Sequence, residues 1–547
     1  MAKPTTRRQV QQFPFVVDPA AVPQPLTFLV PPKGMDTQLR LNQMGRGTSR
    51  LVQNLQIRDN HYVARDGTSI VGDISSTQLL YATSIKLSTG RTWNLRWRTT
   101  GVDYLSGGVW VPCGGAVYNA PNTSQVVVTG WNDTLVFTVG VGQLMVLSFV
   151  NNAPTVTVLT DSPSNVGHVT TYAGRIIASL RASPRIQWCV KNDNTRWDPT
   201  DPLNQGAGFE DLLSAPGGGV DQQTAVSPIS DEYAYAIRTN SVWQMTLTGN
   251  PDAPFRFTVL YQGIGCEYPG AVAAVHRGVC FPSRDNVMMI TPDGKREIGQ
   301  PIRELVRVDK KYLRDASGAF DERNNVYVLS IPTDNSLNAH PIYHFNLDSG
   351  GEGPGGWVKD VYPFPVKAIS FVRYSQGISI DQLTGAINQL QGAIDDLGQS
   401  DRTVGMMMAM AGTSRLVARN TASRNNDAER DVNSAGVEVE GGWRVETGYI
   451  IPERTTKMVS LVQVEIEYES DADTELVFEY STDGGVTWTQ YAARNALATT
   501  RPKILRVRQT IEREAIQLAI NCAATPNFRL IGLHAYASSG SMSEDAR

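Results

Sequence analysis

The sequence predicts an all-β protein: a β-propeller with inserted loops plus a C-terminal β domain. Short runs of β-branched and aromatic residues alternate with Gly, Pro, Asn and Asp along most of the chain, as strands alternate with turns. These runs recur in units of roughly 40 to 50 residues, the length typical of propeller blades. Helical apolar stripes are nearly absent, and 547 residues exceed what one core usually sustains. A pair of large β-sandwiches is the alternative architecture.

The first element, residues 1–40, is predicted to be an extended, Pro-rich N-terminal arm. Proline favours extended backbone and removes donors from a strand ladder. It also interrupts every apolar run here, so neither a signal peptide nor a membrane span is expected. The interrupting residues are Pro14, Pro19, Pro23, Pro25, Pro31 and Pro32.

Residues 41–375 are predicted to form the propeller core. Near its start, Asp66-Gly67 is a dipeptide typical of a hairpin turn. The most informative stretch, GRIIASLRASPRIQWCVKNDNTRWDP (174–199), predicts two strands joined across Pro184, with Trp197 packing just past a polar turn. The Gly-rich residues 206–223 are expected to form a long surface loop.

Residues 376–435 are predicted to be a linker or loop insertion, part of which has heptad spacing. One interpretation is a short helix that docks in an oligomer. The other is an ordered loop held to the scaffold by its apolar residues, because Gly385 and Gly392 disfavour a helix. The heptad positions are Ile380, Leu383, Ile387, Leu390, Ile394 and Leu397.

Residues 436–547 are again strand-like and are predicted to form a C-terminal β domain, some of whose strands could complete the propeller. Within it, STDGGVTW matches the Asp-box pattern S-x-D-x-G-x-T-W, which is a hairpin turn. Asp483 is expected to accept hydrogen bonds from turn amides while the glycines adopt positive φ and Trp488 packs beneath. The structural turn residues are Ser481, Asp483, Gly485, Thr487 and Trp488.

Charge and cysteine content narrow the function classes. The formal net charge of −4 argues against tight binding of nucleic-acid phosphates by the whole surface. Local basic patches are still compatible with this net charge. Five cysteines without a CxxC pair predict free, mostly buried thiols in a protein assembled in a reducing cytoplasm. They are Cys113, Cys189, Cys266, Cys280 and Cys522.

No catalytic or metal site is expected. His340 and His344 would lie roughly 13 Å apart on one face of a strand and lack a third ligand. The carboxylates of residues 191–201 lack EF-hand spacing, and Asp231-Glu232 and Asp395-Asp396 are adjacent pairs typical of solvated turns. The sequence therefore predicts no catalytic residue, no metal, no cofactor and no enzymatic activity.

The order of these motifs resembles that of the tail nozzle, or packaged-DNA-stabilisation, proteins of short-tailed (podovirus-type) bacteriophages. The segment 174–199 carries the resemblance first. It is followed by DEYAYAIRTNSVWQM, by IGCEYPGAVAAVHRGVCFPSRDNVMMITPDGKREIGQPI, and by NNVYVLSIP with Trp357. ISIDQLTGAINQLQGAIDDL and STDGGVTW also have counterparts there. The resemblance covers roughly residues 40 to 500 and rests on the order of motifs rather than on any one of them.

The resemblance implies a structural virion protein, a propeller subunit of a homo-hexameric nozzle assembled in the host cytoplasm. The ring would adjoin the tail adaptor, anchor tail fibres or spikes, and retain and then conduct the phage DNA without sequence-specific binding. Because cationic contacts would grip phosphate, we expect its lumen to be neutral or acidic. The alternatives are a sialidase-like propeller glycosidase and a glycan- or receptor-binding tail protein.

Overall fold

The computed structural model confirms the all-β propeller prediction and divides the chain into two compact units. One unit comprises residues 1–52, 57–63 and 442–547, and the other comprises residues 53–56 and 64–441. The structure describes residues 24–27, 33–38, 44, 48–58, 61–73, 75–150, 153–213, 221–276, 278–283, 286–303, 316–331, 341–347, 356–362, 366–373, 404–410, 416–424, 442–450, 459–513, 515–523 and 527–539.

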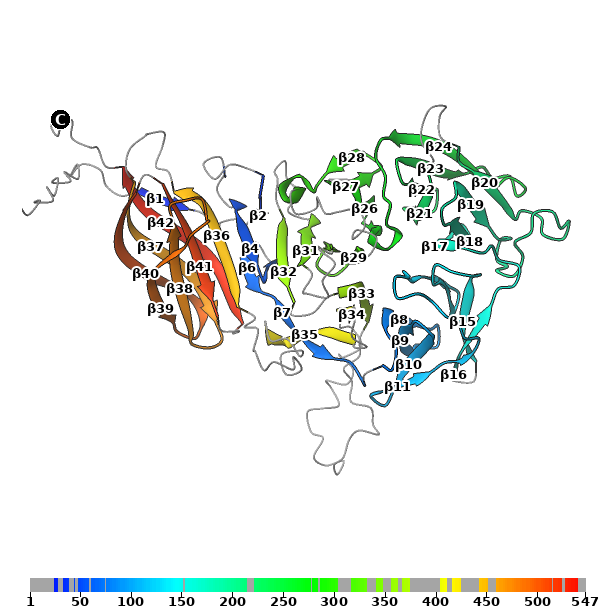
Figure 1. Cartoon of the computed structure of the whole chain (residues 1–547), viewed down its shortest axis with the longest axis horizontal. Helices are drawn as coiled ribbons and strands as arrows, with labels where there is room; N and C mark the ends of the chain where they lie inside the picture. The colour runs from blue at the N-terminus through cyan, green and yellow to red at the C-terminus, as the bar shows by residue number, and fades with distance from the viewer. Residues whose placement is uncertain are drawn as a thin grey trace, which may run out of the picture. The chain divides into compact units, whose positions relative to one another are not determined.

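The larger unit is a seven-bladed β-propeller in the part of the chain that the structure describes (Figure 1). Each blade is an antiparallel sheet whose strands follow one another outward from the centre, and a short extra strand, β12 (Gly114–Gly115), lies parallel to β16. Blade 1 contains β8 (Leu79–Lys86), β9 (Thr92–Arg98), β10 (Gly101–Ser106) and β11 (Val109–Pro112). Blade 2 contains β13 (Val127–Trp131), β14 (Thr134–Thr138), β15 (Met145–Val150) and β16 (Ala153–Val158). Blade 3 contains β17 (Val166–Tyr172), β18 (Arg175–Leu180), β19 (Arg185–Trp188) and β20 (Gly208–Asp211). Blade 4 contains β21 (Gln223–Pro228), β22 (Tyr233–Arg238), β23 (Ser241–Leu247) and β24 (Phe255–Gln262). Blade 5 contains β25 (Ala273–Val275), β26 (Gly278–Ser283), β27 (Asn286–Thr291) and β28 (Gly294–Glu297). Blade 6 contains β29 (Ser317–Asp321), β30 (Val326–Ser330), β31 (Pro341–Asn346) and β32 (Trp357–Val361).

The seventh blade closes the ring with a strand from the other end of the propeller sequence. Its first three strands are β33 (Val366–Arg373), β34 (Val404–Met410) and β35 (Leu416–Arg424), and its outermost strand is β7 (Asp66–Ile70). β7 pairs antiparallel with β35 and leads directly toward β8, the first strand of blade 1. In Figure 1 the blue β7 accordingly lies beside the yellow β35.

The hydrophobic core of the propeller lies between neighbouring blades. Ile176 and Ala178 of β18 pack toward blade 2, whereas Ile177 between them packs toward blade 4. β34 repeats this arrangement, because Met406 and Met408 pack against blade 6 while Met407 packs against blade 1. Successive strand residues point to opposite faces, so a strand covered on both faces becomes a continuous apolar run.

Two sequence predictions in the propeller are confirmed, and another is wrong in part. The segment 174–199 forms the β18–β19 hairpin, and Trp197 is fully buried with its Nε1 donating to the Asn194 carbonyl at 2.7 Å. The predicted surface loop 206–223 instead contributes β20, which completes blade 3 by pairing with β19. The sequence of β20 reads as a loop because it carries the polar residues Glu210 and Asp211, which an outermost strand can expose to solvent.

Three predicted boundaries also differ from the structure. The predicted linker 376–435 contains β34 and β35, two strands of blade 7, while the heptad segment lies outside the described residues. Asp66-Gly67 begins β7 rather than turning a hairpin. Residues 41–52 and 57–63 belong to the smaller unit rather than to the propeller.

The smaller unit is a β-sandwich that contains the predicted C-terminal β domain. Its strands do not complete the propeller, because β7 already closes the seventh blade. Trp443 of one sheet packs on Phe528 of the other with ring centroids 5.0 Å apart. One sheet has β4 (Leu51–Gln53), β36 (Trp443–Ile450), β41 (Ile516–Cys522), β38 (Thr474–Ser481) and β39 (Thr489–Ala496) in this order. The other has β40 (Thr499–Arg513), β37 (Val459–Ser470), β42 (Phe528–Ser539), β6 (His61–Ala64) and β5 (Leu55–Arg58), with β1 (Gln24–Thr27) also paired to β42.

Only parts of the predicted N-terminal arm are described. They include β1, which pairs with β42, and β2 (Gly34–Met35), which pairs parallel to β3 (Thr48–Ser49). These parts of the arm are thus built into sheets. In the portion of the chain that the structure describes, no helix has the length and apolarity to cross a membrane.

Candidate functional site

The structure brings the five predicted Asp-box residues together in the turn between β38 and β39. Asp483 Oδ1 accepts from the backbone amides of Val486 and Thr487 at 3.1 and 2.9 Å, and Oδ2 accepts from the Thr487 hydroxyl at 2.5 Å. Ser481 donates to Asp483 at 2.7 Å and accepts from the Gly485 amide. Gly485 adopts a φ of +86°, which a side chain would strain.

These hydrogen bonds fix the protonation state of Asp483. The Thr487 hydroxyl and the turn amides favour the carboxylate, and together with Ser481 they lower the pKa of Asp483 to about 2. Because both oxygens are engaged by the turn itself, the Asp-box serves as a structural turn. It lies in the sandwich rather than in a propeller blade.

One arginine, Arg444, supports the Asp-box from the sandwich sheet. The Arg444 guanidinium lies 4.7 Å from the centre of the Trp488 ring, in cation–π geometry. The same group binds Glu446 and Glu479 at 2.6 Å each. The two carboxylates therefore converge on one cation, which in turn packs on the Trp488 ring.

The predicted polar turn at residues 191–201 is also held by its own backbone. Asp193, Asp198 and Asp201 each accept from the amide two residues later, at 3.0, 2.9 and 2.9 Å. Such local bonds are those of Asx turns. Among the described residues, no group of three or more His, Cys, Asp or Glu side chains could hold a metal ion.

The remaining sequence candidates do not form one site. His344 is buried and lies 2.8 Å from Asp360, which accepts a further bond from Gln56 at 3.2 Å. His340 and the pair Asp395-Asp396 lie outside the described residues. The five cysteines are free and four of them are buried, as predicted. Burial raises the pKa of Cys189 to about 11, which keeps that thiol protonated at neutral pH.

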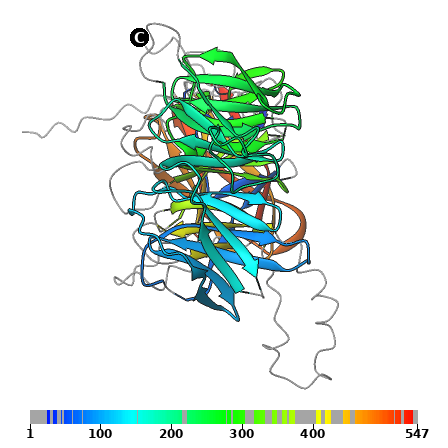
Figure 2. The same cartoon turned by 90° about the vertical axis from the view of Figure 1, so that its right-hand side faces the viewer.

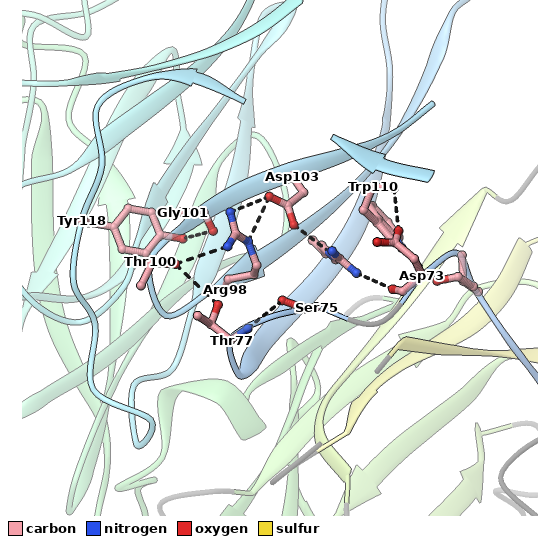
Figure 3. A network of polar contacts seen from close by, with 11 residues as sticks. Asp73, Ser75, Thr77, Arg98, Thr100, Gly101, Asp103, Trp110 and Tyr118 are labelled. Carbon is pink, nitrogen blue, oxygen red and sulfur yellow. Dashed lines mark hydrogen bonds and ion pairs between the residues drawn. The ribbon is translucent and has the colours of Figure 1, made fainter. Parts of the chain in front are cut away.

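A buried polar network holds the segment that connects β7 to blade 1 (Figure 3). Arg96 and Arg98 both bind Asp103, at 2.8 Å, with the carboxylate almost fully buried. Arg96 also donates to the Asp73 carbonyl at 2.9 Å, and the Asp73 carboxylate accepts from the Trp110 amide at 2.8 Å. These bonds attach the segment after β7 to β9, β10 and β11.

The Trp110 ring fixes the same crossing from its other side. Its Nε1 donates to the Val71 carbonyl at 2.9 Å. A Cβ at Gly72, where φ is +67°, would come within 2.4 Å of Trp110 Nε1. A side chain at position 72 would therefore be both strained and crowded against Trp110.

A central cavity of about 550 Å³ is lined by residues in or next to the first strands of all seven blades. Most of its lining is small or uncharged, and the ionisable side chains among it are Tyr81, His168, Glu322 and Lys367. Burial lowers the pKa of His168 to about 4, so its imidazole is neutral at pH 7. Sequence reasoning missed this cavity because its lining comes from seven distant strands.

A smaller pocket of about 190 Å³ shares Gln125 and Pro269 with the lining of the central cavity. Its walls come from the loops that join successive blades and from the loops between second and third strands. Arg181 and Glu267 contribute opposite charges to it. The pocket is therefore small and carries one cation and one carboxylate among mostly uncharged residues.

Comparisons with known proteins give no family. No family model matches the chain, and no curated protein matches it. Among similar solved structures is the dihydro-heme d1 dehydrogenase NirN in complex with DHE, with 9% identity and a TM-score of 0.31. The match covers 57% of this chain and 61% of that chain, less than two thirds of the latter. YCF48 bound to D1 peptide has 9% identity and a TM-score of 0.37, covering 67% of this chain and 98% of that one.

Proposed function

We propose that this protein is a structural subunit of the hexameric tail nozzle of a short-tailed bacteriophage. The ring would retain and then conduct the genome, contact the adaptor ring, and anchor fibres or spikes. Its role would be mechanical rather than catalytic, exercised in the virion after assembly in the host cytoplasm.

The observation that carries the proposal is the placement of the nozzle-like motifs on successive blades. Segment 174–199 begins with β18 and β19 of blade 3, and DEYAYAIRTNSVWQM provides β22 and β23 of blade 4. The next motif provides the strands of blade 5, and NNVYVLSIP provides β30 of blade 6, where Trp357 is fully buried. The resemblance thus follows the units of the fold in order.

An apolar rim on blades 1 to 4 supports assembly with other subunits. Large apolar side chains are exposed on the outer strands of these four blades, whereas the described strands of blades 5 to 7 expose none of comparable size. Figure 2 shows this side of the propeller, with its cyan and green strands toward the viewer. We infer that these side chains, which lie on neighbouring blades, contribute to the contact with the next subunit. The rim strands carry Val109, Val158, Phe209, Leu247 and Val259.

The central cavity of the propeller cannot itself be the genome conduit. Its volume of about 550 Å³ falls within the range of small-molecule pockets. In a nozzle, the conduit would instead be the space enclosed by the six subunits.

The proposal is tested by electron microscopy and light scattering of the purified full chain, alone and mixed with an extract of short phage tails. We expect six-fold rings, alone or on tails. A variant with Leu247→Lys and Val259→Lys, which adds two charges to the apolar rim, should lose the ring while remaining folded. The matched control, Val486→Lys with Leu497→Lys, alters two exposed apolar residues of the sandwich and should keep it.

Two results would contradict the proposal. One is the absence of six-fold rings under both conditions while the chain remains folded. The other is hydrolysis of glycans by the purified monomer, which would favour the sialidase-like alternative.

A further inference from the structure

One sheet of the sandwich ends in a long basic edge strand. β40 has 15 residues and lies at the end of its sheet, paired on one side only, with β37. It carries five Lys or Arg residues and a single Glu, although the whole chain has a net charge of −4. The cations are Arg501, Lys503, Arg506, Arg508 and Arg513.

The second edge of β40 has no strand on it within the described part of the chain. An edge of this kind presents a row of unpaired amide and carbonyl groups to which another strand can add. Ile504 is 51% exposed in the middle of the strand and supplies an apolar contact. The backbone of β40, apart from Pro502, which has no amide hydrogen, and the Ile504 side chain are thus available to an added strand.

The cations of β40 are only partly neutralised by the sandwich. Arg506 binds Glu465 through Nε at 2.6 Å, and Arg508 binds Gln463 through Nε at 2.8 Å. Both bonds reach toward β37, and the Arg506 side chain is still 56% exposed. Arg501 and Lys503 are exposed and have no ion pair among the described residues.

We propose that β40 is a docking edge for an extended, acidic segment of a partner protein, which adds to the sheet as a further strand. Arg506 and Arg508 lie two residues apart and therefore on one face of β40. Acidic residues at alternate positions of the added strand would lie opposite them, about 5 Å away between Cβ atoms. This inference goes beyond the nozzle proposal and does not require a six-fold ring.

The test uses the full chain and a fluorescent ten-residue peptide that alternates Glu and Val. Fluorescence anisotropy should detect binding of this peptide and none of its Lys–Val counterpart. The Arg506→Glu, Arg508→Glu variant should bind at least about tenfold more weakly, because both reversals place like charges opposite each other. The control variant, Arg256→Glu with Arg323→Glu, has the same change in net charge on the propeller and should bind as the wild type does.

Amide hydrogen exchange separates strand addition from loose attraction. The bound peptide should slow exchange at alternate amides of residues 499–513, because an added strand pairs with every second residue of the edge. Peptide binding without this protection would overturn the proposal.

Two other results would also overturn it. If a 20-base-pair DNA duplex binds and the Glu peptide does not compete for it, the basic strand is a nucleic-acid site. If nothing binds, the cations only protect an exposed edge from aggregation. Ring formation is scored separately by microscopy, so failure of the nozzle proposal is distinguishable from failure of this one.

Discussion

At the residue scale, the hydrogen bonds of the Asp483 carboxylate hold a turn. Its folded pKa of about 2 lies below the ordinary value of 3.8. The carboxylate therefore stabilises the folded turn fully above about pH 4, and this contribution is lost as the pH falls toward 2. We expect amide hydrogen exchange at Gly485, Val486 and Thr487 to accelerate, relative to the intrinsic exchange rates, as the pH falls over that interval.

The Asp483→Asn variant should show the fast exchange already at pH 5 and little further change below it. Asp293→Asn, at an exposed turn of blade 5, is the control and should leave these amides protected. An unchanged exchange rate in Asp483→Asn would show that the glycines alone hold the turn.

Gly72 provides a second test at the residue scale. Gly72→Ala combines positive φ with a contact of 2.4 Å to Trp110, so we expect a loss of about 2 to 3 kcal/mol in the free energy of unfolding of the propeller. Gly107→Ala has a similar φ of +57° but no atom within 4 Å, and should cost about 1 kcal/mol. Urea unfolding measures both, and equal losses would mean that the Trp110 contact is easily relieved.

At the scale of elements, the buried Asp103 network joins the strand crossing to blade 1. Asp103→Ala leaves Arg96 without its carboxylate in a site where that side chain is 4% exposed, so we expect a loss of about 3 to 5 kcal/mol. The control is Asp211→Ala, which breaks the Arg185 ion pair of blade 3 at 2.7 Å. Both partners there are about one third exposed, and the loss should be about 1 kcal/mol or less. Urea unfolding measures the free energy of unfolding of both variants. Equal losses in the two variants would mean that the Asp103 network does not stabilise ring closure.

How far the sequence predicts an element depends on which neighbours cover it. The β18–β19 hairpin was predictable because its apolar runs flank a Pro-containing turn, and the Asp-box because all of its bonds are local. By contrast, β34 reads as Met-rich connector sequence because blade 6 covers one of its faces and blade 1 the other, which leaves a continuous apolar run without alternation. β7 was misinterpreted because its partner, β35, lies about 350 residues away and no local pattern records that pairing.

At the scale of the whole molecule, the central cavity was equally hidden from the sequence. Each blade contributes one strand to its wall, and each of those strands reads locally as an ordinary first strand. Closure by β7 is what makes the seven sheets one ring. The large exposed apolar side chains of its described strands then lie on blades 1 to 4 of this ring.

Closure predicts that linking β7 to β35 stabilises the propeller more than linking two strands of one blade. Ser69 and Ala418 are paired across β7 and β35, so Ser69→Cys with Ala418→Cys places two thiols across the closure. A disulfide there would close a loop of about 350 residues, for which the chain-entropy model gives a stabilisation of about 6 kcal/mol. Thr246→Cys with Arg256→Cys crosses the β23–β24 pair and closes a loop of about 10 residues, for which the same model gives about 3 kcal/mol.

Urea unfolding of the oxidised and reduced forms of each variant measures the two effects. The five native cysteines are free, whereas the introduced thiols stand on directly paired residues of neighbouring strands, so the introduced pair should oxidise first. We expect the closure disulfide to raise the unfolding midpoint more than the hairpin disulfide does. Equal shifts would mean that the ends of the ring remain together in the unfolded chain, and that closure by β7 adds little cooperativity to the fold.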